Sequence, residues 1–229
     1  MNKIYGDETL FEVLKTSQLY FGNDIVFLCS FSNEDMIILD SLCRNHIPID
    51  IYTIDTGRLN PETYEFIDEV IKRYEVKLNY LVPDSGSLQS MLLENGPQLF
   101  YESVEKRKLC CKIRKVDPLS KLLTGKRAWI SGIRSTQTSE RQKFKLYEVN
   151  NGLTKINPLI DWTDEDVKTV IQSLGIPANK LYRKGYRSIG CYPCTRPVFE
   201  GEGDRDGRWW WENGSKECGI HTSNLGGSN

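Results

Sequence analysis

The first third of the chain alternates short apolar runs with longer stretches in which apolar residues recur every three or four positions. Residues 25–28 are apolar throughout, as expected of a strand that is buried on both faces. Segments 49–54 and 76–82 predict two further strands, and the helical spacing of 36–42 and 66–74 predicts helices between them. Strand–helix–strand repeats of this length predict a doubly wound, mostly parallel α/β sheet flanked by helices.

The loops that follow the first two predicted strands are the first candidate site. Ser32 can cap a helix that has Glu34 and Asp35 in its first turn, where negative charge is favourable. In doubly wound sheets, ligands bind at the C-terminal ends of the strands. This rule points to residues 30–33 and 55–58 as parts of a binding site.

The pattern changes along the rest of the chain. Residues 85–123 are mainly helical in pattern, residues 128–132 predict a strand, and residues 145–160 predict one or two more. Thr163 and Asp166 form a capping box that predicts a helix running to Leu174, and Gly175 ends it. Beyond Gly185 the chain is rich in glycine, arginine and aromatic residues and has no clear periodicity. We expect one α/β domain, including the cysteine segments described below, over residues 1–208, and a flexible C-terminal tail over residues 209–229.

Composition narrows the class of protein. The 229 residues are enough for one domain with a full core, and 39% of them are hydrophobic, as in globular proteins. The net charge of −1 gives no global field that would attract nucleic acid. No apolar run approaches the ~18 residues of a membrane span, and the N-terminus lacks the apolar core of a signal peptide. We therefore expect a cytoplasmic protein that binds neither membranes nor nucleic acid.

Seven cysteines are the strongest chemical signal in the sequence. An odd count in a protein expected in the cytoplasm argues against a disulfide framework. Cys29 and Cys43 fall in the apolar strand and helix of the first repeat, where they suit the core. The others form an adjacent pair, a Cys-x-x-Cys turn and a single C-terminal thiol: Cys110, Cys111, Cys191, Cys194 and Cys218.

The pair and the turn together offer thiolates that suit either tetrahedral zinc or a [4Fe–4S] cluster. Adjacent side chains on a helix diverge by about 100°, so Cys110 and Cys111 reach a single zinc ion poorly but can reach two irons of one cluster. The pattern favours the cluster, and a non-enzymatic zinc-binding module remains the alternative. Lys115 would lie one helical turn from Cys111, where its ammonium could contact both a cluster and a bound anion.

Cys218 stands in a stretch without apolar periodicity, which predicts an exposed thiol. Nearby Lys216, Arg205, Arg208 and His221 would lower its pKa and favour the reactive thiolate. Cys218 is therefore the candidate nucleophile.

A series of short motifs spans most of the chain, at residues 30–32, 54–58, 110–111, 131–134, 185–195, 207–212 and 217–221. Taken in order, they resemble the assimilatory adenylyl-sulfate reductases, which are relatives of the phosphoadenylyl-sulfate reductases. The paired cysteines together with the Cys-x-x-Cys turn are typical of the iron–sulfur branch of that family.

The resemblance implies an adenine-nucleotide alpha-hydrolase-like fold and the reduction of adenosine 5′-phosphosulfate (APS) to sulfite and AMP in sulfate assimilation. Cys218 would attack the sulfur and form a thiosulfonate, Lys115 would assist, and thioredoxin or glutaredoxin would then release sulfite. The resemblance also implies a homodimer or homotetramer. The implied ligands of the [4Fe–4S] cluster are Cys110, Cys111, Cys191 and Cys194.

The implied substrate-binding residues follow from the positions that match the family motifs. The loop at 30–35 departs from the Ser-Gly-Gly-x-Asp-Ser sequence of ATP pyrophosphatases, so we do not expect pyrophosphate-type ATP binding. The candidates are Ser30, Ser32, Asp55, Thr56, Gly57, Arg58, Gly132, Arg134, Arg205, Arg208 and His221.

Two alternative enzymes stay open at this point. The same reaction on 3′-phosphoadenosine 5′-phosphosulfate (PAPS) would need an additional basic contact for the 3′-phosphate. A tRNA-thiolating ATP pyrophosphatase would need the intact pyrophosphatase loop and a basic surface, and the sequence has neither.

Overall fold

The molecule is built on a six-stranded sheet with the strand order β3-β2-β1-β4-β6-β5. The computed structural model describes residues 5–214, 216–217, 219–222 and 225. All neighbouring strands pair in parallel except β5 and β6, which form an antiparallel hairpin. The predicted mostly parallel, doubly wound α/β fold is therefore confirmed. The strands are β1 (Ile25–Leu28), β2 (Asp50–Ile54), β3 (Leu78–Leu81), β4 (Ala128–Ile130), β5 (Tyr147–Asn150) and β6 (Leu153–Ile156).

Helices connect the strands and continue beyond them. No helix among the described residues is long and apolar enough to cross a membrane. The α-helices are α1 (Tyr5–Phe21), α2 (Asn33–Arg44), α3 (Pro61–Tyr74), α4 (Ser85–Asn95), α5 (Val104–Cys111), α6 (Asp117–Leu123), α7 (Asp164–Leu174) and α8 (Gly219–Thr222).

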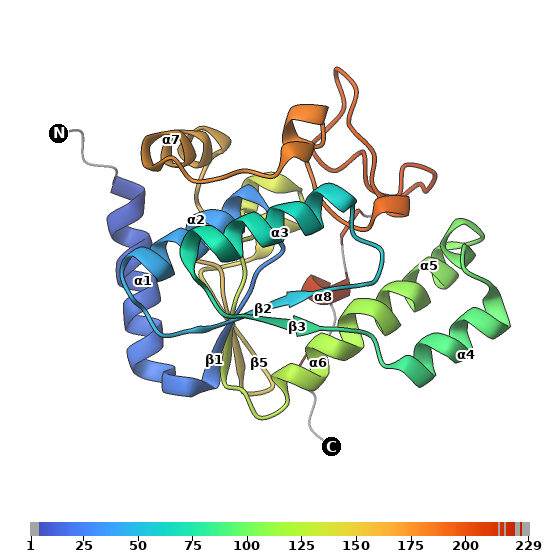
Figure 1. Ribbon diagram of the computed structural model, residues 1–229, viewed down its shortest axis with the longest axis horizontal. Coiled ribbons are helices and arrows are strands. Elements are labelled where there is room, and N and C mark those ends of the chain that lie inside the picture. The colour runs from blue at the N-terminus through green and yellow to red at the C-terminus, as the bar shows by residue number, and fades with distance from the viewer. Residues whose placement is uncertain (1–4, 215, 218, 223–224, 226–229) are drawn as a thin grey trace.

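Helices pack on both faces of the sheet (Figure 1). On one face, apolar side chains of α1, α2, α3 and α7 form a core with Phe27 and Ile130 of the central strands. On the other face, α6 packs against Val26 and Trp129 from the same strands. Because successive side chains of a strand point to opposite faces, β1 must be apolar at every position.

The site of ligand binding follows from the order of the strands. From the central strand β1, the chain adds β2 and β3 on one side and β4 and β6 on the other. The order reverses between β1 and β4, which pair in parallel through Ile25 and Ala128. In open α/β sheets ligands bind at such a switch point, beyond the carboxyl ends of the strands. Loops 29–32 and 131–134 leave β1 and β4 there.

The helical region before β4 is interrupted directly after the cysteine pair. A π-helix, η3 (Lys112–Val116), joins α5 to α6. Its hydrogen bonds reach five residues rather than four, so the predicted α-helix gives way to a π-helix at Lys115. Cys111 and Lys115 still line one small cavity, as their predicted proximity requires. Short π-helical insertions occur frequently at functional sites, and this one carries Lys115.

The predicted division of the chain at residue 208 stays a prediction. Trp209, the first residue of the proposed tail, is buried among the cysteines of α5 and the Cys-x-x-Cys turn. Its backbone N–H donates a hydrogen bond of 3.1 Å to the carbonyl oxygen of Cys194.

Candidate active site

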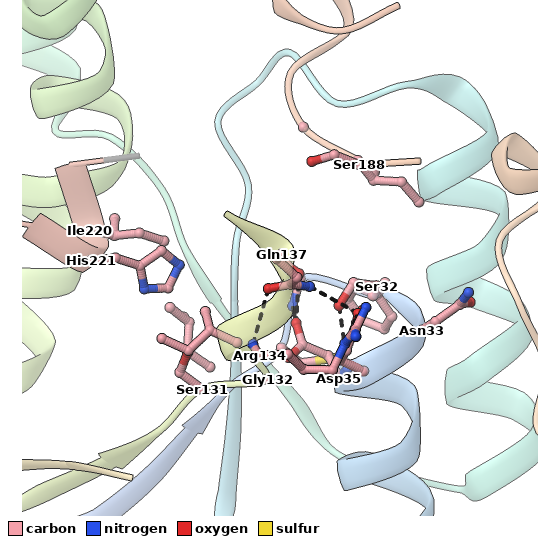
Figure 2. Close-up of a pocket in the computed structure, with 18 of the residues that line it drawn as sticks. Ser32, Asn33, Asp35, Ser131, Gly132, Arg134, Gln137, Ser188, Ile220 and His221 are labelled. Carbon is pink, nitrogen blue, oxygen red and sulfur yellow. Dashed lines mark hydrogen bonds and ion pairs between the residues drawn. The ribbon is translucent and has the colours of Figure 1, made fainter. Parts of the chain in front are cut away.

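A cavity of about 290 Å³ lies at the switch point of the sheet. Its walls come from the loops after β1, β2 and β4, from η3, and from segments 187–191, 204–208 and 220–221. Figure 2 shows Ile220 and His221 on one side of this cavity and the loop at Ser32 on the other. The predicted site residues that line it are Ser30, Ser32, Thr56, Gly132, Arg134, Lys115, Cys191, Arg205, Arg208 and His221.

Three of the predicted substrate residues lie outside the described lining of this cavity: Asp55, Gly57 and Arg58. The Asp55 carboxylate accepts hydrogen bonds of 2.8 Å from the Gly57 backbone N–H and from the Tyr64 hydroxyl. Arg58 lies beside the cysteines instead, where its guanidinium donates to the Pro97 carbonyl at 2.6 Å. Their assignment to the substrate stays a prediction.

The loop after β1 is folded around a buried carboxylate. The Ser30 backbone N–H and hydroxyl both donate to the Asp35 carboxylate at 2.6 Å, and Ser32 caps α2 by accepting from the Asp35 N–H. Burial raises the pKa of Asp35 to about 6. Because Asp35 takes up the Ser30 N–H, that donor is not available to a phosphate, in keeping with the departure of this loop from the pyrophosphatase sequence.

Gly132 lets the loops after β1 and β4 approach each other. A Cβ atom at this position would lie 2.2 Å from a carboxylate oxygen of Asp35. Any larger side chain at position 132 would therefore displace the carboxylate that organises the opposite loop.

Arg134 joins this loop to neighbouring elements. Its guanidinium pairs with Glu34 at 2.8 Å and with Asp164 at 2.5 Å, and it donates to the Trp162 carbonyl at 3.2 Å. Two carboxylates thus balance the charge of Arg134. The residue braces the cavity wall through these pairs, and it also lines the cavity. Its predicted role toward the substrate is untested.

Further positive charge comes from Lys115, Arg141, Arg205 and Arg208, which line the cavity and together form its cationic wall. Arg208 is buried, and its guanidinium donates to the Ile189 carbonyl at 3.0 Å. Gly190 leaves room for it, because a Cβ there would lie 2.5 Å from the guanidinium carbon. Such a wall can bind an anionic group and stabilise charge that develops on it.

Arg141 is a site residue that the sequence did not predict. It lies in η5 (Arg141–Lys143), a short 3-10 helix beyond the predicted strand, and the motif assigned to the site ended at Arg134. The available signal was weak, because an arginine in a polar loop is usually a solvated surface residue. Here it is buried and lines the cavity.

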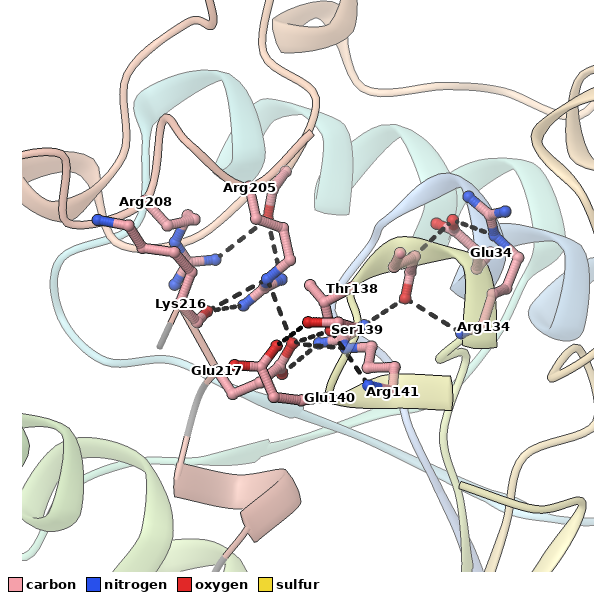
Figure 3. A network of polar contacts seen from close by, with 12 residues as sticks. Glu34, Arg134, Thr138, Ser139, Glu140, Arg141, Arg205, Arg208, Lys216 and Glu217 are labelled. Atoms are coloured by element: carbon pink, nitrogen blue, oxygen red, sulfur yellow. Dashed lines mark hydrogen bonds and ion pairs between the residues drawn. The ribbon is translucent and has the colours of Figure 1, made fainter. Parts of the chain in front are cut away.

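Arg141 and Arg205 hold the residues just before position 218 (Figure 3). The Arg141 guanidinium forms a two-pronged pair with the Glu217 carboxylate, with both distances 3.0 Å. Arg205 lies 3.6 Å from the same carboxylate and donates to the Lys216 carbonyl at 2.6 Å. Although burial opposes ionisation of Glu217, these arginines hold its pKa below the usual value.

His221 lies on the other side of position 218 in the sequence and also lines the cavity. Its ring stacks on Trp129, with centroids 6.3 Å apart and planes 12° from parallel. Burial, together with the positive charges of Arg141, Lys155 and Arg205, holds the pKa of His221 well below its usual value. The imidazole is therefore neutral. Cys218, the predicted nucleophile, lies outside the described residues.

A second, smaller cavity brings the four predicted cluster ligands together. Cys110 and Cys111 at the end of α5 and Cys191 and Cys194 of the Cys-x-x-Cys turn are buried and line it jointly. No group of three or more His, Cys, Asp or Glu side chains within the described part of the chain is placed to hold a metal ion. The four cysteines share one pocket, although their side chains in the described part of the chain are not arranged around a common metal position.

The surroundings of these thiols are cationic. Arg58, Arg107, Arg114 and Lys115 also line the small cavity. Such charges can balance a thiolate-ligated iron–sulfur cluster, which fits the donor set of four cysteines.

Three of the four thiols differ in acidity. Burial raises the pKa of Cys194 to about 12 and also raises that of Cys110. Burial also opposes ionisation of Cys191, but the charge of Lys115 and a contact with the Thr56 hydroxyl bring its pKa below the usual value. The Thr56 oxygen and the Cys191 sulfur are 3.3 Å apart. Cys191 and Lys115 line both cavities, and they join the two sites.

The sequence profile of the phosphoadenosine phosphosulfate reductase domain matches residues 24–197. The chain belongs to this reductase family. It is 42% identical to the adenosine 5′-phosphosulfate reductase of Allochromatium vinosum, over 87% of this chain and 79% of that one. It is 39% identical to the enzyme of the same name from Pseudomonas aeruginosa strain UCBPP-PA14, over 96% of this chain and 85% of that one. The predicted family is therefore confirmed.

Solved structures of the reductase family and of more distant enzymes share the fold. The phosphoadenylyl-sulfate (PAPS) reductase of Candida auris, in a phosphate complex, superposes with a TM-score of 0.68 at 29% identity, covering 80% of this chain and 88% of that one. The FMN adenylyltransferase of Candida glabrata reaches 0.55 at 17% identity, covering 84% of this chain and 65% of that one. At that identity the similarity shows the fold alone.

Proposed function

We propose that this reductase converts APS to sulfite and AMP in sulfate assimilation, with Cys218 as nucleophile and a separate dithiol protein as reductant. One observation carries the proposal. A cavity with a cationic wall adjoins a pocket of four buried cysteines, and Lys115 and Cys191 line both. The names of the bacterial relatives support APS as the substrate.

The proposed cofactor is a [4Fe–4S] cluster held by Cys110, Cys111, Cys191 and Cys194. When bound, it would supply fixed charge and structural order beside the substrate anion, since the electrons arrive as thiols. Among the described basic residues, Lys115 lines both the cysteine pocket and the substrate cavity, so its ammonium can contact both the cluster and the substrate anion.

The chemistry follows from the mixed anhydride of sulfate and AMP. The Cys218 thiolate attacks the electrophilic sulfur, the S–O bond to AMP breaks, and AMP leaves with the bonding electrons. The enzyme then carries a thiosulfonate on Cys218. A thiolate of thioredoxin or glutaredoxin attacks the cysteine sulfur and releases sulfite, and its second thiol resolves the mixed disulfide to regenerate Cys218.

The cationic wall serves the first step. A thiolate and a sulfonate repel each other, and the repulsion is strong in a cavity from which water is partly excluded. Lys115, Arg141, Arg205 and Arg208 lie where they can offset it. His221 also lines this cavity, where its ring stacks on Trp129. Because its imidazole is neutral, it adds no positive charge to the cationic wall.

PAPS is the second candidate substrate. Membership of the family does not distinguish PAPS from APS, since the Candida auris enzyme is named a PAPS reductase. The charge of the cavity lining does not separate the two nucleotides, because Glu34 and Asp164 are paired with Arg134. The names of the bacterial relatives favour APS.

Turnover of the two nucleotides with thioredoxin as reductant tests the proposal. We expect rapid formation of sulfite and AMP from APS, and a kcat/KM at least about a hundredfold lower with PAPS. Cys218→Ser should retain its iron and lose turnover. Turnover by Cys218→Ser would contradict the nucleophile assignment, and equal rates on both nucleotides would contradict the substrate assignment.

Two further expectations belong to this proposal. We infer that the enzyme acts in the cytoplasm, where thioredoxin and glutaredoxin keep thiols reduced. A homodimer or homotetramer is expected, and the molar mass of the protein in solution checks it.

A further inference from the structure

The tail of this chain places a carboxylate among the arginines of the cationic wall. Glu217 is buried, and both of its oxygens accept hydrogen bonds from Arg141. One oxygen also accepts from the Thr138 hydroxyl at 2.9 Å and lies 3.6 Å from Arg205. An anion held by a two-pronged arginine pair and a second cation is surrounded as a bound sulfate or phosphate group would be.

The arginines have few donors left for any other anion. Arg141 uses its Nε and Nη2 for Glu217, and its Nη1 donates to Gln137. Arg205 uses its Nε and Nη2 for the Lys216 carbonyl and its Nη1 for Ser188. Yet both arginines line the cavity. A negatively charged ligand that engages either guanidinium must compete with the contacts made by residues 216–217.

We propose that Glu217 is an internal competitor of the substrate, a carboxylate that occupies Arg141 and Arg205 until the sulfonate or phosphate of the nucleotide takes its place. This inference rests on the proposed function, because it assumes an anionic nucleotide in the cavity. Exchange of one anion for another keeps the buried arginines paired at every stage, which avoids the cost of leaving a buried charge alone. The same exchange breaks the contacts of Glu217 with Arg141, so the binding of the anionic nucleotide and the release of Glu217 are coupled.

The sign of the effect separates competition from a merely structural role. If Glu217 only holds the arginines in place, its removal weakens the binding of an anionic nucleotide. If Glu217 competes, its removal strengthens that binding. A nucleoside without a charged group does not need the arginines, so its affinity should not respond in either direction.

The test measures ADP and adenosine binding by titration calorimetry, using the full chain purified anaerobically. ADP is a stable probe whose terminal phosphate stands in for the sulfonate. In Glu217→Gln, which keeps the side-chain shape but not the charge, we expect the Kd for ADP to fall about tenfold, as for loss of a charge-assisted hydrogen-bonded pair. The Kd for adenosine should stay within about twofold of wild type.

Glu202→Gln is the matched control. Glu202 forms a two-pronged pair with Arg196, at 2.7 and 2.8 Å, and neither residue is among those that line the cavity in the described part of the chain. This variant should leave both affinities unchanged. Thr138→Val, which removes one hydrogen bond to Glu217, provides a milder variant and should tighten ADP binding by a smaller factor.

Unchanged or weaker ADP binding in both Glu217→Gln and Thr138→Val would overturn the inference, as would an equal change in adenosine binding. A different result would contradict the proposed function: wild-type protein that does not turn over APS. If wild-type protein binds ADP and reduces APS but the variants do not bind ADP more tightly, only the inference about Glu217 is contradicted.

Discussion

The sheet and the segment that follows residue 185 are held together by different forces. Around the sheet, buried apolar side chains such as Phe27, Leu39 and Ile130 form one continuous core. Beyond residue 185, buried charged side chains pair with carbonyl groups or with charges elsewhere in the chain, as Arg208 does with the Ile189 carbonyl and Glu217 does with Arg141. Apolar packing is non-directional and tolerant, whereas each buried ion pair depends on one exact partner. The sheet therefore provides stability, and the C-terminal segment provides a site whose contacts can be exchanged.

The largest expected effect lies at the boundary between these regions. Cys110 belongs to α5 but meets the cysteines of the C-terminal segment in one pocket. Cys110→Ser should lose both iron and turnover, because serine is a poor ligand for iron in this setting. Iron and sulfide analysis together with an APS reduction assay measures both.

Cys43→Ser is the control for that experiment. Cys43 is half-buried in α2, in the apolar core of the sheet. Its substitution should keep iron and turnover. Iron bound to Cys110→Ser at the wild-type level would contradict the assignment of Cys110 as a ligand.

A substitution in the core of the sheet should have the opposite pattern. Leu39 is fully buried in α2, and Leu39→Ala removes packed methyl groups and leaves a cavity. The free energy of unfolding should fall by about 3 kcal/mol, while iron content per folded chain stays the same. Urea unfolding followed by circular dichroism gives the first quantity. If Leu39→Ala lost iron but kept its free energy of unfolding, the proposed division between a stabilising sheet and a C-terminal site would be contradicted.

The third effect, no larger than that of Leu39→Ala, concerns a buried charge in the sheet region. Burial raises the pKa of Asp35 from 3.8 to about 6. The unfolded chain therefore releases this proton at lower pH than the folded protein does, and the contribution of Asp35 to stability falls as pH rises from about 4 to about 6. The loss is on the order of 3 kcal/mol and is complete above that range.

Asp35→Asn should lack this part of the pH dependence, since the amide does not titrate. The difference in unfolding free energy between wild type and variant, measured by urea titration at several pH values from 4 to 7, isolates it. A constant difference across this range would show that the carboxyl titrates normally in the folded protein.

The sheet could be predicted because its signals are local. The apolar run at β1 and the Thr163 capping box of α7, which ends at Gly175 in a left-handed conformation, both agree with the structure. Helix α1 was not predicted, although Leu10 and Leu14 lie one turn apart and are buried. Local pattern thus sufficed for most of the fold.

The site was predictable in its residues and less so in its contacts. The cysteine pair and the Cys-x-x-Cys turn indicated a shared site, and the structure lines one pocket with them. The Arg134–Glu34 and Arg141–Glu217 pairs join residues far apart in the sequence, and no local pattern signals which carboxylate a buried arginine will meet. The π-helix at Lys115 depends on tertiary packing and was likewise not predictable.

Iron and acid-labile sulfide in anaerobically purified wild-type protein, measured alongside its APS reduction rate, test the central claim most directly. That claim is that four cysteines from two distant segments hold an iron–sulfur cluster beside the pocket in which APS is reduced. We predict a brown protein with iron and sulfide in the ratio of a [4Fe–4S] cluster, whose turnover falls in proportion as iron is lost. A colourless, iron-free protein that reduces APS at full rate would contradict the account.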